Sequence, residues 1–298
     1  MAERVVVVGG GAGGPSAAAK AKRLKPDLDI HIIEAGPHVS YAACPTPYYI
    51  ADMIATPEEI IARTPEEFEK SGIHVHLNTA VEELDFNQGT ALDSRGKRWS
   101  FDKLVYAAGA SSILPDIPGA HSGRIFALKS LQDAIRIKTF IETRKPKSVI
   151  ILGAGFIALE MCEAFRLRGL DTTVLYRGNL PAKRMGEELS KIVLDEMKAN
   201  GVRFVPGVEP AAIVEEADRL RVETKDGVFS ADMVLAALGV HPGVAATGVC
   251  SSWRRGEQTG PGGRSKYRRR SIRISRRGRI LVLQVLRAGS GLYGSERG

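Results

Sequence analysis

Two glycine-rich stretches of the chain have residue types and spacing that could hold a phosphate. In the first, Gly9, Gly11 and Gly14 follow the pattern G-x-G-x-x-G, with Ala12 and Gly13 between them. The first glycine of such a pattern permits a tight turn, and the second lets a pyrophosphate approach the backbone. The third lets the following helix pack close to a strand. The spacing therefore predicts an anion site at this turn.

The residues around this turn predict the elements that position it. The β-branched run at residues 4–8 reads as a buried parallel strand, and the small residues at 17–19 continue as a helix whose N-terminal amides face the anion. A second strand, at residues 29–33, ends at Glu34. That acid lies about 20 residues after the last glycine, where a carboxylate can accept hydrogen bonds from ribose hydroxyls. Together these elements predict that the first turn binds a dinucleotide.

A second copy of the pattern occurs later in the chain. A strand is expected at residues 147–152, and Gly153 and Gly155 repeat the fingerprint, with Ala158 in the place of the third glycine. Two such fingerprints, each between a strand and a helix, predict two nucleotide sites.

The second copy has no acid at the ribose position. Its second strand, residues 171–175, runs into Tyr176 and Arg177. Arg177, backed by Lys183 and Arg184, can form charge-assisted bonds with a 2′-phosphate, which favours NADPH over NADH. The alternative is that Arg177 is a solvated surface residue.

An isolated cysteine could carry redox chemistry. Cys44 is followed by Pro45 and Pro47, and proline is favoured in the first turn of a helix, so a short helix is expected from Tyr48 to Ile54. A thiol at the start of a helix has a stabilised thiolate. The alternative is a buried, unreactive cysteine. Position alone does not decide between the two.

The remaining chain predicts the connecting elements. A strand at residues 103–110 ends in Ala108 and Gly109, small residues that let a cofactor pass close to the backbone. A linking helix is expected at 130–143, hairpins at 80–101 and 211–229, and a last buried strand at 233–239. His74 and His76 share one strand face, which favours a half-solvated surface over a metal pair. No metal site is predicted.

Composition restricts the class of protein. The 298 residues, 44% of them hydrophobic, are enough for two globular domains. No run approaches the roughly 20 apolar residues of a membrane span, and no targeting leader precedes the first strand. The three cysteines form no even framework, which fits a reducing compartment. We therefore expect a cytoplasmic protein.

The positive charge is concentrated after residue 248. From Val249 onward the chain has thirteen Lys and Arg against two acids, while the net charge of the whole chain is +8. Twelve of these thirteen residues are arginine. So abrupt a change of usage predicts a shifted reading frame or a truncated gene. The alternative is a basic arm that binds RNA through its phosphates.

The motifs together resemble those of the FAD-dependent pyridine nucleotide-disulfide oxidoreductases. The resemblance covers about residues 5–242 and is strongest to the branch with coenzyme A-disulfide reductases, NADH oxidases and NADH peroxidases. It rests on the two glycine turns and Glu34, on Ser40 and Cys44 followed by Pro47-Tyr48, on residues 105–109, and on residues 238–242.

This resemblance implies an activity and further site residues. Hydride would pass from NADPH or NADH to FAD and then to a disulfide, persulfide or peroxide at the single redox Cys44, with Ser40 as a nearby hydrogen-bond donor. It implies that Glu160 lies near the nicotinamide ribose. It also implies cofactor contacts at Ala80, Val81, Phe156, Ile157 and Gly239.

The chain departs from the family pattern at several positions, one of them Ala43, where the family often has Asn or Ser before the cysteine. Pro45 stands where glycine usually follows the cysteine, and Ala108 replaces the usual threonine. In addition, no aspartate follows residue 248, so the family's Ala-x-Gly-Asp segment and its dimerisation domain are missing. The resemblance implies a homodimer in the family, but the domain that forms that dimer is not expected in this sequence.

We therefore predict an α/β chain with two Rossmann-like domains, parallel sheets and inserted β-hairpins. The expected ranges are an incomplete FAD-binding domain at 1–115, a crossing and linking helix at 116–147, an NAD(P)H-binding domain at 148–243, and a disordered basic tail at 244–298. The function predicted first is a flavoprotein reductase acting on a small-molecule acceptor through Cys44. The alternatives are a flavin-dependent oxidase or ferredoxin reductase without thiol chemistry, and an inactive remnant with a nucleic-acid-binding tail.

Overall fold

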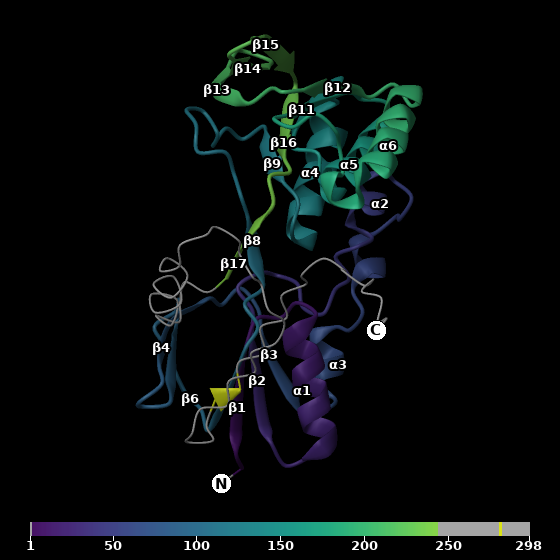
Figure 1. The fold of residues 1–298 in the computed structure, drawn as a ribbon. Helices are drawn as coiled ribbons and strands as arrows, with labels where there is room; N and C mark the ends of the chain where they lie inside the picture. The colour runs from purple at the N-terminus through teal and green to yellow at the C-terminus, as the bar shows by residue number, and fades with distance from the viewer. Residues whose placement is uncertain (1, 244–279, 282–298) are drawn as a thin grey trace, which may run out of the picture. The chain divides into compact units, whose positions relative to one another are not determined.

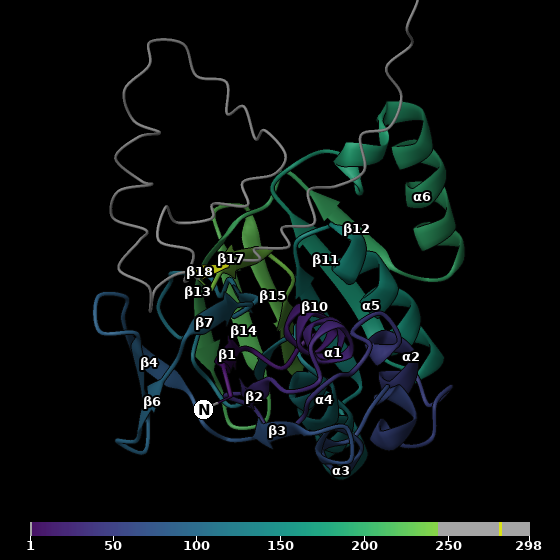
Figure 2. The same cartoon turned by 90° about the horizontal axis from the view of Figure 1, so that it is seen from below.

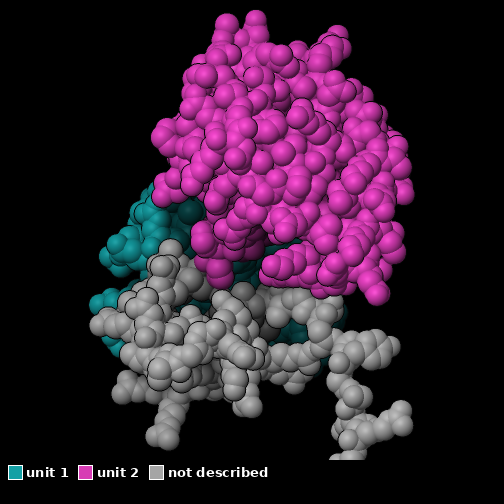
Figure 3. Space-filling view, turned by 45° about the horizontal axis from the view of Figure 1, so that its top comes forward, with its two compact units in different colours: residues 1–40, 63–109, 243–298 teal, residues 41–62, 110–242 magenta. Residues whose placement is uncertain are grey.

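The chain forms two compact units, and each contains one of the two glycine turns. The computed structural model describes residues 2–243 and 280–281. Within them, unit 1 takes in residues 2–40, 63–109, 243 and 280–281, whereas unit 2 takes in residues 41–62 and 110–242 (Figure 3). The predicted α/β class with parallel sheets is confirmed in both units.

Unit 1 is built on a parallel sheet with the strand order β18-β7-β1-β2-β3 (Figure 1). A second, antiparallel sheet contains β4, β5 and β6. The elements are β1 (Arg4–Val8), α1 (Gly13–Leu24), β2 (Asp29–Ile33), α3 (Pro65–Glu69), β3 (Ile73–His76), β4 (Val81–Asp85), β5 (Thr90–Asp93), β6 (Arg98–Ser100), β7 (Lys103–Tyr106) and β18 (Ile280–Leu281).

Alternation along β1 explains the layers of unit 1. Val5 and Val7 point to one face of the sheet, where they pack with Ala18 of α1, while Val6 and Val8 point to the other face. That second face is covered by residues of the antiparallel sheet, including Trp99. Figure 2 shows α1 beside the strands that it covers. Both faces are buried, which is why β1 is continuously apolar.

Unit 2 repeats this plan with the parallel order β12-β11-β10-β16-β9. An antiparallel sheet contains β13, β14 and β15, and β17 pairs with β8. The elements are α2 (Thr46–Ile50), a 3-10 helix (Pro57–Ile60), β8 (Ala110–Ser112), β9 (Ile125–Ala127), α4 (Leu131–Arg144), β10 (Ser148–Leu152), α5 (Phe156–Leu167), β11 (Asp171–Tyr176), a 3-10 helix (Lys183–Met185), α6 (Glu187–Ala199), β12 (Arg203–Pro206), β13 (Pro210–Glu215), β14 (Leu220–Thr224), β15 (Gly227–Ala231), β16 (Met233–Ala236) and β17 (Val240–Pro242).

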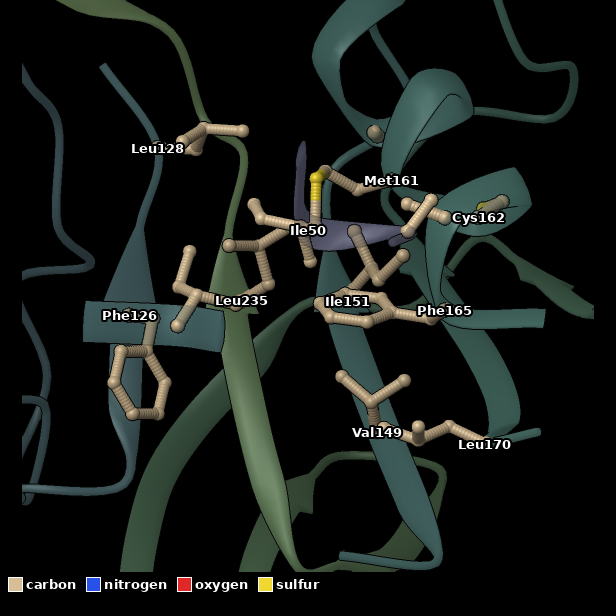
Figure 4. Close-up of a cluster of buried hydrophobic side chains, with 14 of the residues drawn as sticks. Ile50, Phe126, Leu128, Val149, Ile151, Met161, Cys162, Phe165, Leu170 and Leu235 are labelled. Carbon is tan, nitrogen blue, oxygen red and sulfur yellow. The ribbon is translucent and has the colours of Figure 1, made fainter. Parts of the chain in front are cut away.

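The main core of unit 2 includes a segment that is distant in sequence. Val149 and Ile151 of β10 pack on the face that carries α4 and α5, and Ile50 of α2 is buried in the same cluster. Figure 4 shows Ile50 among Met161, Phe165 and Ile151. Helix α2 therefore belongs to unit 2 because its buried side chains complete that core.

This packing divides the chain differently from the predicted domain ranges. Residues 41–62 were expected in the first domain, but the contacts group them with unit 2, and they group residue 243 and β18 with unit 1. The basic tail was predicted to be disordered over 244–298; apart from β18 it lies outside the described residues.

Several local predictions can be compared with the observed elements. The linking helix is confirmed as α4, whose N-cap Ser130 accepts a hydrogen bond from the Asp133 amide at 3.1 Å. The helix expected from Tyr48 to Ile54 is wrong in its bounds, because α2 runs from Thr46 to Ile50.

 The φ of Asp52 is 65°, outside the helical region, so the helical hydrogen-bonding pattern does not continue to Ile54.

The two inserted hairpins are three-stranded sheets rather than two-stranded hairpins. In unit 1 the extra strand is β5, which pairs with β4 on one side and β6 on the other. In unit 2, β14 is in the same way flanked by β13 and β15. Across residues 2–243 and 280–281, no helix combines the length and apolar character needed to cross a membrane.

Candidate functional site

The first glycine turn is tightly packed at Gly9 and Gly14, and it is open beside Gly11. Gly9 has a φ of 104°, and a Cβ added there would collide with the carbonyl oxygen of Ala107. A Cβ at Gly14 would collide with the carbonyl oxygen of Gly9. In contrast, a Cβ at Gly11 would meet nothing within 4 Å. The strand and helix thus approach each other closely and leave room beside Gly11, as a bound pyrophosphate requires.

Glu34 is held beside this turn by backbone amides. Its Oε2 accepts a hydrogen bond from the Gly10 amide at 2.5 Å, and its Oε1 accepts one from the Gly36 amide at 2.7 Å. Each carboxylate oxygen has further acceptor capacity, so the group could also accept bonds from ribose hydroxyls. The Glu34 carboxylate and the open space beside Gly11 together fit a dinucleotide.

Other predicted residues of unit 1 lie near the same turn or its strands. The amide of Ser40, whose φ is 52°, donates to the carbonyl oxygen of Gly10 at 2.7 Å. Ala80 follows Thr79, whose amide donates to the carbonyl oxygen of Glu34 at 2.9 Å. Ala108 and Gly109 are exposed just after β7.

Val81 starts β4 and is partly buried against the second face of the sheet. Ala12 and Gly13 lie in the turn itself, where Ala12 is the N-cap of α1 and Gly13 its first residue. A Cβ at Gly13 would come no closer than 3.8 Å to another heavy atom. These positions therefore leave the front of the turn uncrowded.

The second glycine turn has the same form. Gly153 has a φ of 110°, and a Cβ there would clash with the carbonyl oxygen of Ala237. Gly155 is the N-cap of α5 and has open space in front of it. Ala158, in the place of the third glycine, is 1% exposed. The turn therefore also fits a pyrophosphate, although its third position carries a methyl group.

The first residues of α5 are exposed although they are apolar. Phe156 and Ile157 are 56% and 41% exposed. Gly239 lies beyond β16 with a φ of 107°, and its carbonyl oxygen accepts a hydrogen bond from the Ile113 amide at 2.9 Å. These three of the predicted cofactor positions are thus at the surface of unit 2, where a ligand could reach them.

The register of the second turn places Tyr176 where unit 1 has Glu34. The Gly153 amide donates to the carbonyl oxygen of Leu175 at 3.0 Å, and Tyr176 follows directly. Arg177 is the next residue; its side chain is 78% exposed, and its guanidinium lies 4.0 Å from the Glu209 carboxylate. An exposed pair of this kind holds Arg177 weakly, so its charge is available to an anion.

Cys44 is an exposed thiol in unit 2. The segment around it is fixed on both sides, because the Ala42 amide donates to the carbonyl oxygen of Ile60 at 3.0 Å and the Thr46 hydroxyl donates to that of Ala43 at 2.7 Å. The alternative of a buried cysteine is therefore wrong for Cys44. The predicted partner Ser40 belongs to unit 1.

A shallow pocket lies between α2 and α5 within unit 2. It is lined by Pro47, Tyr48, Ala51, Glu160, Glu163, Ala164 and Leu167. Burial raises the pKa of Glu160 above its ordinary value. The pocket joins the helix that follows Cys44 to the helix that follows the second glycine turn, so the predicted residues Cys44 and Glu160 belong to neighbouring elements of one unit.

Whereas Cys44 is exposed, Cys162 is buried. It lies in α5, is 3% exposed, and is part of the main core of unit 2. Burial raises the pKa of its thiol to about 12. A thiol that stays protonated is a poor nucleophile, so Cys162 is a structural residue.

Sequence reasoning missed a histidine cluster in unit 1. His31 Nδ1 lies 3.1 Å from His76 Nε2, and His31 Nε2 lies 3.0 Å from Asp29 Oδ1. The rings of His31 and His74 stack with centroids 5.0 Å apart. The alternation of His74 and His76 was visible in the sequence, but their contact with His31 depends on the register of β2 with β3. Among the residues that the structure describes, no group of His, Cys, Asp or Glu is arranged to hold a metal ion.

Comparison with known proteins identifies the family. Residues 3–258 match the family model for pyridine nucleotide-disulphide oxidoreductases. The match covers most of the chain, so the chain belongs to this family. The resemblance inferred from the glycine turns and Cys44 is thereby confirmed.

Three individual proteins illustrate the similarity. A NAD(P)H coenzyme A polysulfide/persulfide reductase from Pyrococcus horikoshii is 35% identical over 249 residues, which are 82% of this chain and 55% of that protein. The structure of reduced Bacillus anthracis CoADR-RHD has a TM-score of 0.80 and 27% identity, covering 95% of this chain and 50% of that one.

The third is an engineered water-forming NADPH oxidase bound to NADPH, derived from the NADH oxidase of Lactobacillus brevis. It has a TM-score of 0.79 and 25% identity, with 94% of this chain and 61% of that chain covered. The present chain thus spans about half the length of the curated relatives that it matches.

Proposed function

We propose that this chain carries the nucleotide-binding sites of an FAD- and NAD(P)H-dependent oxidoreductase that reduces a disulfide, persulfide or peroxide through Cys44. The observation that carries the proposal is the exposed thiol of Cys44, placed next to α2, which packs against α5 in the same unit as the second glycine turn. An exposed thiol is accessible to a substrate, whereas the buried Cys162 is not.

The two turns take different dinucleotides in this proposal. FAD binds at the first turn, with its pyrophosphate at Gly11 and an adenosine ribose on Glu34, and the small residues Ala108 and Gly109 let the cofactor pass. NAD(P)H binds at the second turn, at Gly155, with Glu160 near the nicotinamide ribose. The other predicted contacts, Ala80, Val81, Phe156, Ile157 and Gly239, serve as walls of these two sites.

The chemistry is a two-electron reduction of sulfur. When bound, nicotinamide and flavin supply the electrons, as a hydride that leaves NAD(P)H and becomes an electron pair for the sulfur. The Cys44 thiolate attacks a disulfide, forms a mixed disulfide and releases one thiolate, which takes a proton from solvent. Two electrons and a proton then cleave the mixed disulfide, release the second thiol and restore Cys44. Ser40 is proposed as a hydrogen-bond donor to the sulfur.

The acceptor proposed first is a small-molecule disulfide or persulfide. This rests on the relative from Pyrococcus horikoshii, which is a coenzyme A polysulfide/persulfide reductase. Because Cys44 and Cys162 are both free, we place the protein in a reducing compartment such as the cytoplasm. Nucleic acid is not part of the proposal.

NADPH is proposed as the better electron donor. The support is Arg177, a weakly paired arginine at the place where a 2′-phosphate would lie. The engineered NADPH oxidase carries substitutions that remove one aspartate and introduce two arginines. Loss of a negative charge and gain of positive charges favour a nucleotide that carries an additional phosphate, which is the same reason for which we assign Arg177 to NADPH.

A test uses two cysteine variants of the full chain. Purified protein supplied with FAD is titrated with NADPH while the visible flavin absorbance is recorded, and turnover of a coenzyme A disulfide or persulfide is then assayed. Cys44→Ser should leave flavin reduction intact and abolish turnover, whereas the matched Cys162→Ser should retain both. Full turnover in Cys44→Ser would contradict the thiol route.

The same titration separates the second candidate function. The oxidase among the similar structures favours direct electron transfer to dioxygen without thiol chemistry. In that case NADPH would be consumed in air at the same rate in wild type and in Cys44→Ser. A chain that takes up no flavin would instead be an inactive remnant.

A further inference from the structure

Two nearly buried cations of unit 2 converge on one carboxylate. Lys138 Nζ of α4 lies 2.5 Å from Asp52 Oδ1, and Arg168, which follows α5, forms an ion pair with Asp52 Oδ2. The side chains of Lys138 and Arg168 are only 8% and 14% exposed. Removing the partner of a buried charge is strongly destabilising, because the charge is then left without compensation.

Asp52 also has an unusual backbone. Its φ of 65° is in the left-handed region, which non-glycine residues rarely adopt. Such a conformation persists only where the surroundings hold it. The carboxylate explains how it is held, because one of its oxygens contacts a cation on α4 and the other contacts a cation just after α5.

Helix α2, just before Asp52, needs this support. It has five residues, too few to form a stable helix alone. Ile50 anchors one side of it in the core, and the Lys138 ammonium lies 4.4 Å from the centre of the Tyr49 ring. Lys138 forms a second, longer ion pair with Glu142, at 4.0 Å. Asp52 is therefore the main counter-charge that ties the α2 segment to the two long helices.

We propose that Asp52 is a positioning residue that fixes the Cys44-bearing segment against α4 and α5. Cys44 lies two residues before α2, so the place of α2 determines where the thiol sits relative to α5 and the second glycine turn. The consequence for catalysis rests on the proposed function, in which Cys44 is the redox thiol. The structural part of the inference, that Asp52 holds α2 in place, does not rest on the proposed function.

The central variant is Asp52→Asn, which keeps the size of the side chain and its tolerance of positive φ but removes the charge. Hydrogen exchange would be followed at the amides of Ala51 and Met53, which donate to the carbonyl oxygens of Pro47 and Tyr48 at 2.9 Å. We expect exchange at these amides to be about tenfold faster or more, because local opening becomes easier. The kcat for disulfide reduction should fall about tenfold. The KM for NADPH and the rate of flavin reduction should not change.

The control is Glu216→Gln, which removes another ion pair of unit 2. Glu216 lies 2.9 Å from Arg221, between β13 and β14, and belongs to none of α2, α4 and α5. It should change neither the exchange of the α2 amides nor kcat. Unchanged hydrogen exchange at Ala51 and Met53 in Asp52→Asn would contradict the positioning role of Asp52, whether or not kcat falls in that variant.

The exchange measurement separates this inference from the proposed function. If wild type reduced no disulfide, the proposed function would fail, but the amides would still report whether Asp52 holds α2. If Asp52→Asn could not be purified folded, Arg168→Gln would replace it, because Lys138 then keeps its partner. That variant should accelerate exchange at Ala51 and Met53 about threefold, and unchanged exchange would overturn the proposal.

Discussion

The two units share a backbone scheme but differ in the side chains that surround it. In unit 1 the Gly9 amide donates to the carbonyl oxygen of Ile33 at 2.9 Å, and in unit 2 the Gly153 amide donates to that of Leu175 at 3.0 Å. The parallel sheets also have corresponding strand orders. The geometry of a glycine turn is thus fixed by main-chain bonds and by the lack of a Cβ.

What the units do not share determines what each turn can hold. Unit 1 has the Glu34 carboxylate at the end of its second strand, and unit 2 has Tyr176 followed by Arg177. A carboxylate accepts from ribose hydroxyls, whereas a guanidinium pairs with a phosphate. The comparison teaches that the backbone provides the pyrophosphate site and the residue after the second strand provides the selectivity.

The third position of the fingerprint gives the largest expected effect. A Cβ at Gly14 would overlap the carbonyl oxygen of Gly9, so Gly14→Ala must push α1 away from β1. We expect FAD binding to weaken about a thousandfold, or about 4 kcal/mol. The check is the Kd for FAD, obtained from the quenching of flavin fluorescence when FAD binds to the purified protein.

The matched variant in unit 2 is Ala158→Gly. It restores the third glycine and should leave NADPH binding within about threefold of wild type, since the second turn already tolerates a methyl group. Equal losses in both variants would show that the two turns are not packed differently. Tight FAD binding by Gly14→Ala would contradict the collision inferred at Gly9.

Acid should weaken unit 1 through His31. Burial, together with the neighbouring His74, His76 and Arg4, lowers its pKa from 6.5 to about 4, and Asp29 only partly opposes this. Because the folded state binds the proton less well than the unfolded state, the contribution of neutral His31 to the free energy of unfolding is full above about pH 6.5. It is lost as the pH falls towards 4. The loss should reach about 2 kcal/mol at pH 5 and about 3 kcal/mol at pH 4. Urea unfolding at several pH values measures it.

Unit 2 supplies the control for this pH dependence. Thr173 occupies the middle of β11 as His31 occupies the middle of β2, and it has no titratable group. His31→Thr should therefore lose stability less steeply than wild type between pH 7 and pH 5. A pH profile that is the same in both proteins would assign the acid sensitivity to other groups.

An aspartate directly before β7 in unit 1 and one directly before β16 in unit 2 each accept hydrogen bonds from the backbone of a neighbouring strand, but in different numbers. Asp232 Oδ2 accepts from the amides of Lys147 and Ser148 at 2.6 and 2.9 Å, whereas Asp102 Oδ2 accepts from the Arg4 amide at 2.8 Å. Asp232→Ala should cost about 2 kcal/mol and Asp102→Ala about 1 kcal/mol, because hydrogen bonds to a charged group are stronger and unit 2 loses two. Urea midpoints would show the order, and a larger loss in Asp102→Ala would reverse this interpretation.

The sequence predicted the parts of the molecule that local patterns encode. Both glycine turns, the strand before each and Glu34 follow from spacing within about 30 residues, and the observed elements match these patterns. The strand β5 was missed because glycines at both of its ends read as one turn region. The roles of the predicted site residues stay predictions.

Contacts between distant segments could not be predicted in this way. Asp52, Lys138 and Arg168 come from three separate stretches, and no spacing rule relates them. The place of α2 in unit 2 likewise depends on the shape of a core that the sequence does not display. Such contacts are decided by which buried side chains and charges fit together in three dimensions.

A smaller loss of nucleotide binding than that expected for Gly14→Ala tests the selectivity of the second turn. Arg177→Ala removes the guanidinium that we propose for the 2′-phosphate, so the KM for NADPH should rise about tenfold, equivalent to about 1.4 kcal/mol, while the KM for NADH stays unchanged. Glu209→Gln frees Arg177 from its 4.0 Å partner and should lower the KM for NADPH about twofold. Steady-state kinetics with both nucleotides measures the ratio. A parallel rise for NADH and NADPH in Arg177→Ala would mean that Arg177 supports the fold of the turn, and the difference between the two units would then lie elsewhere than in charge.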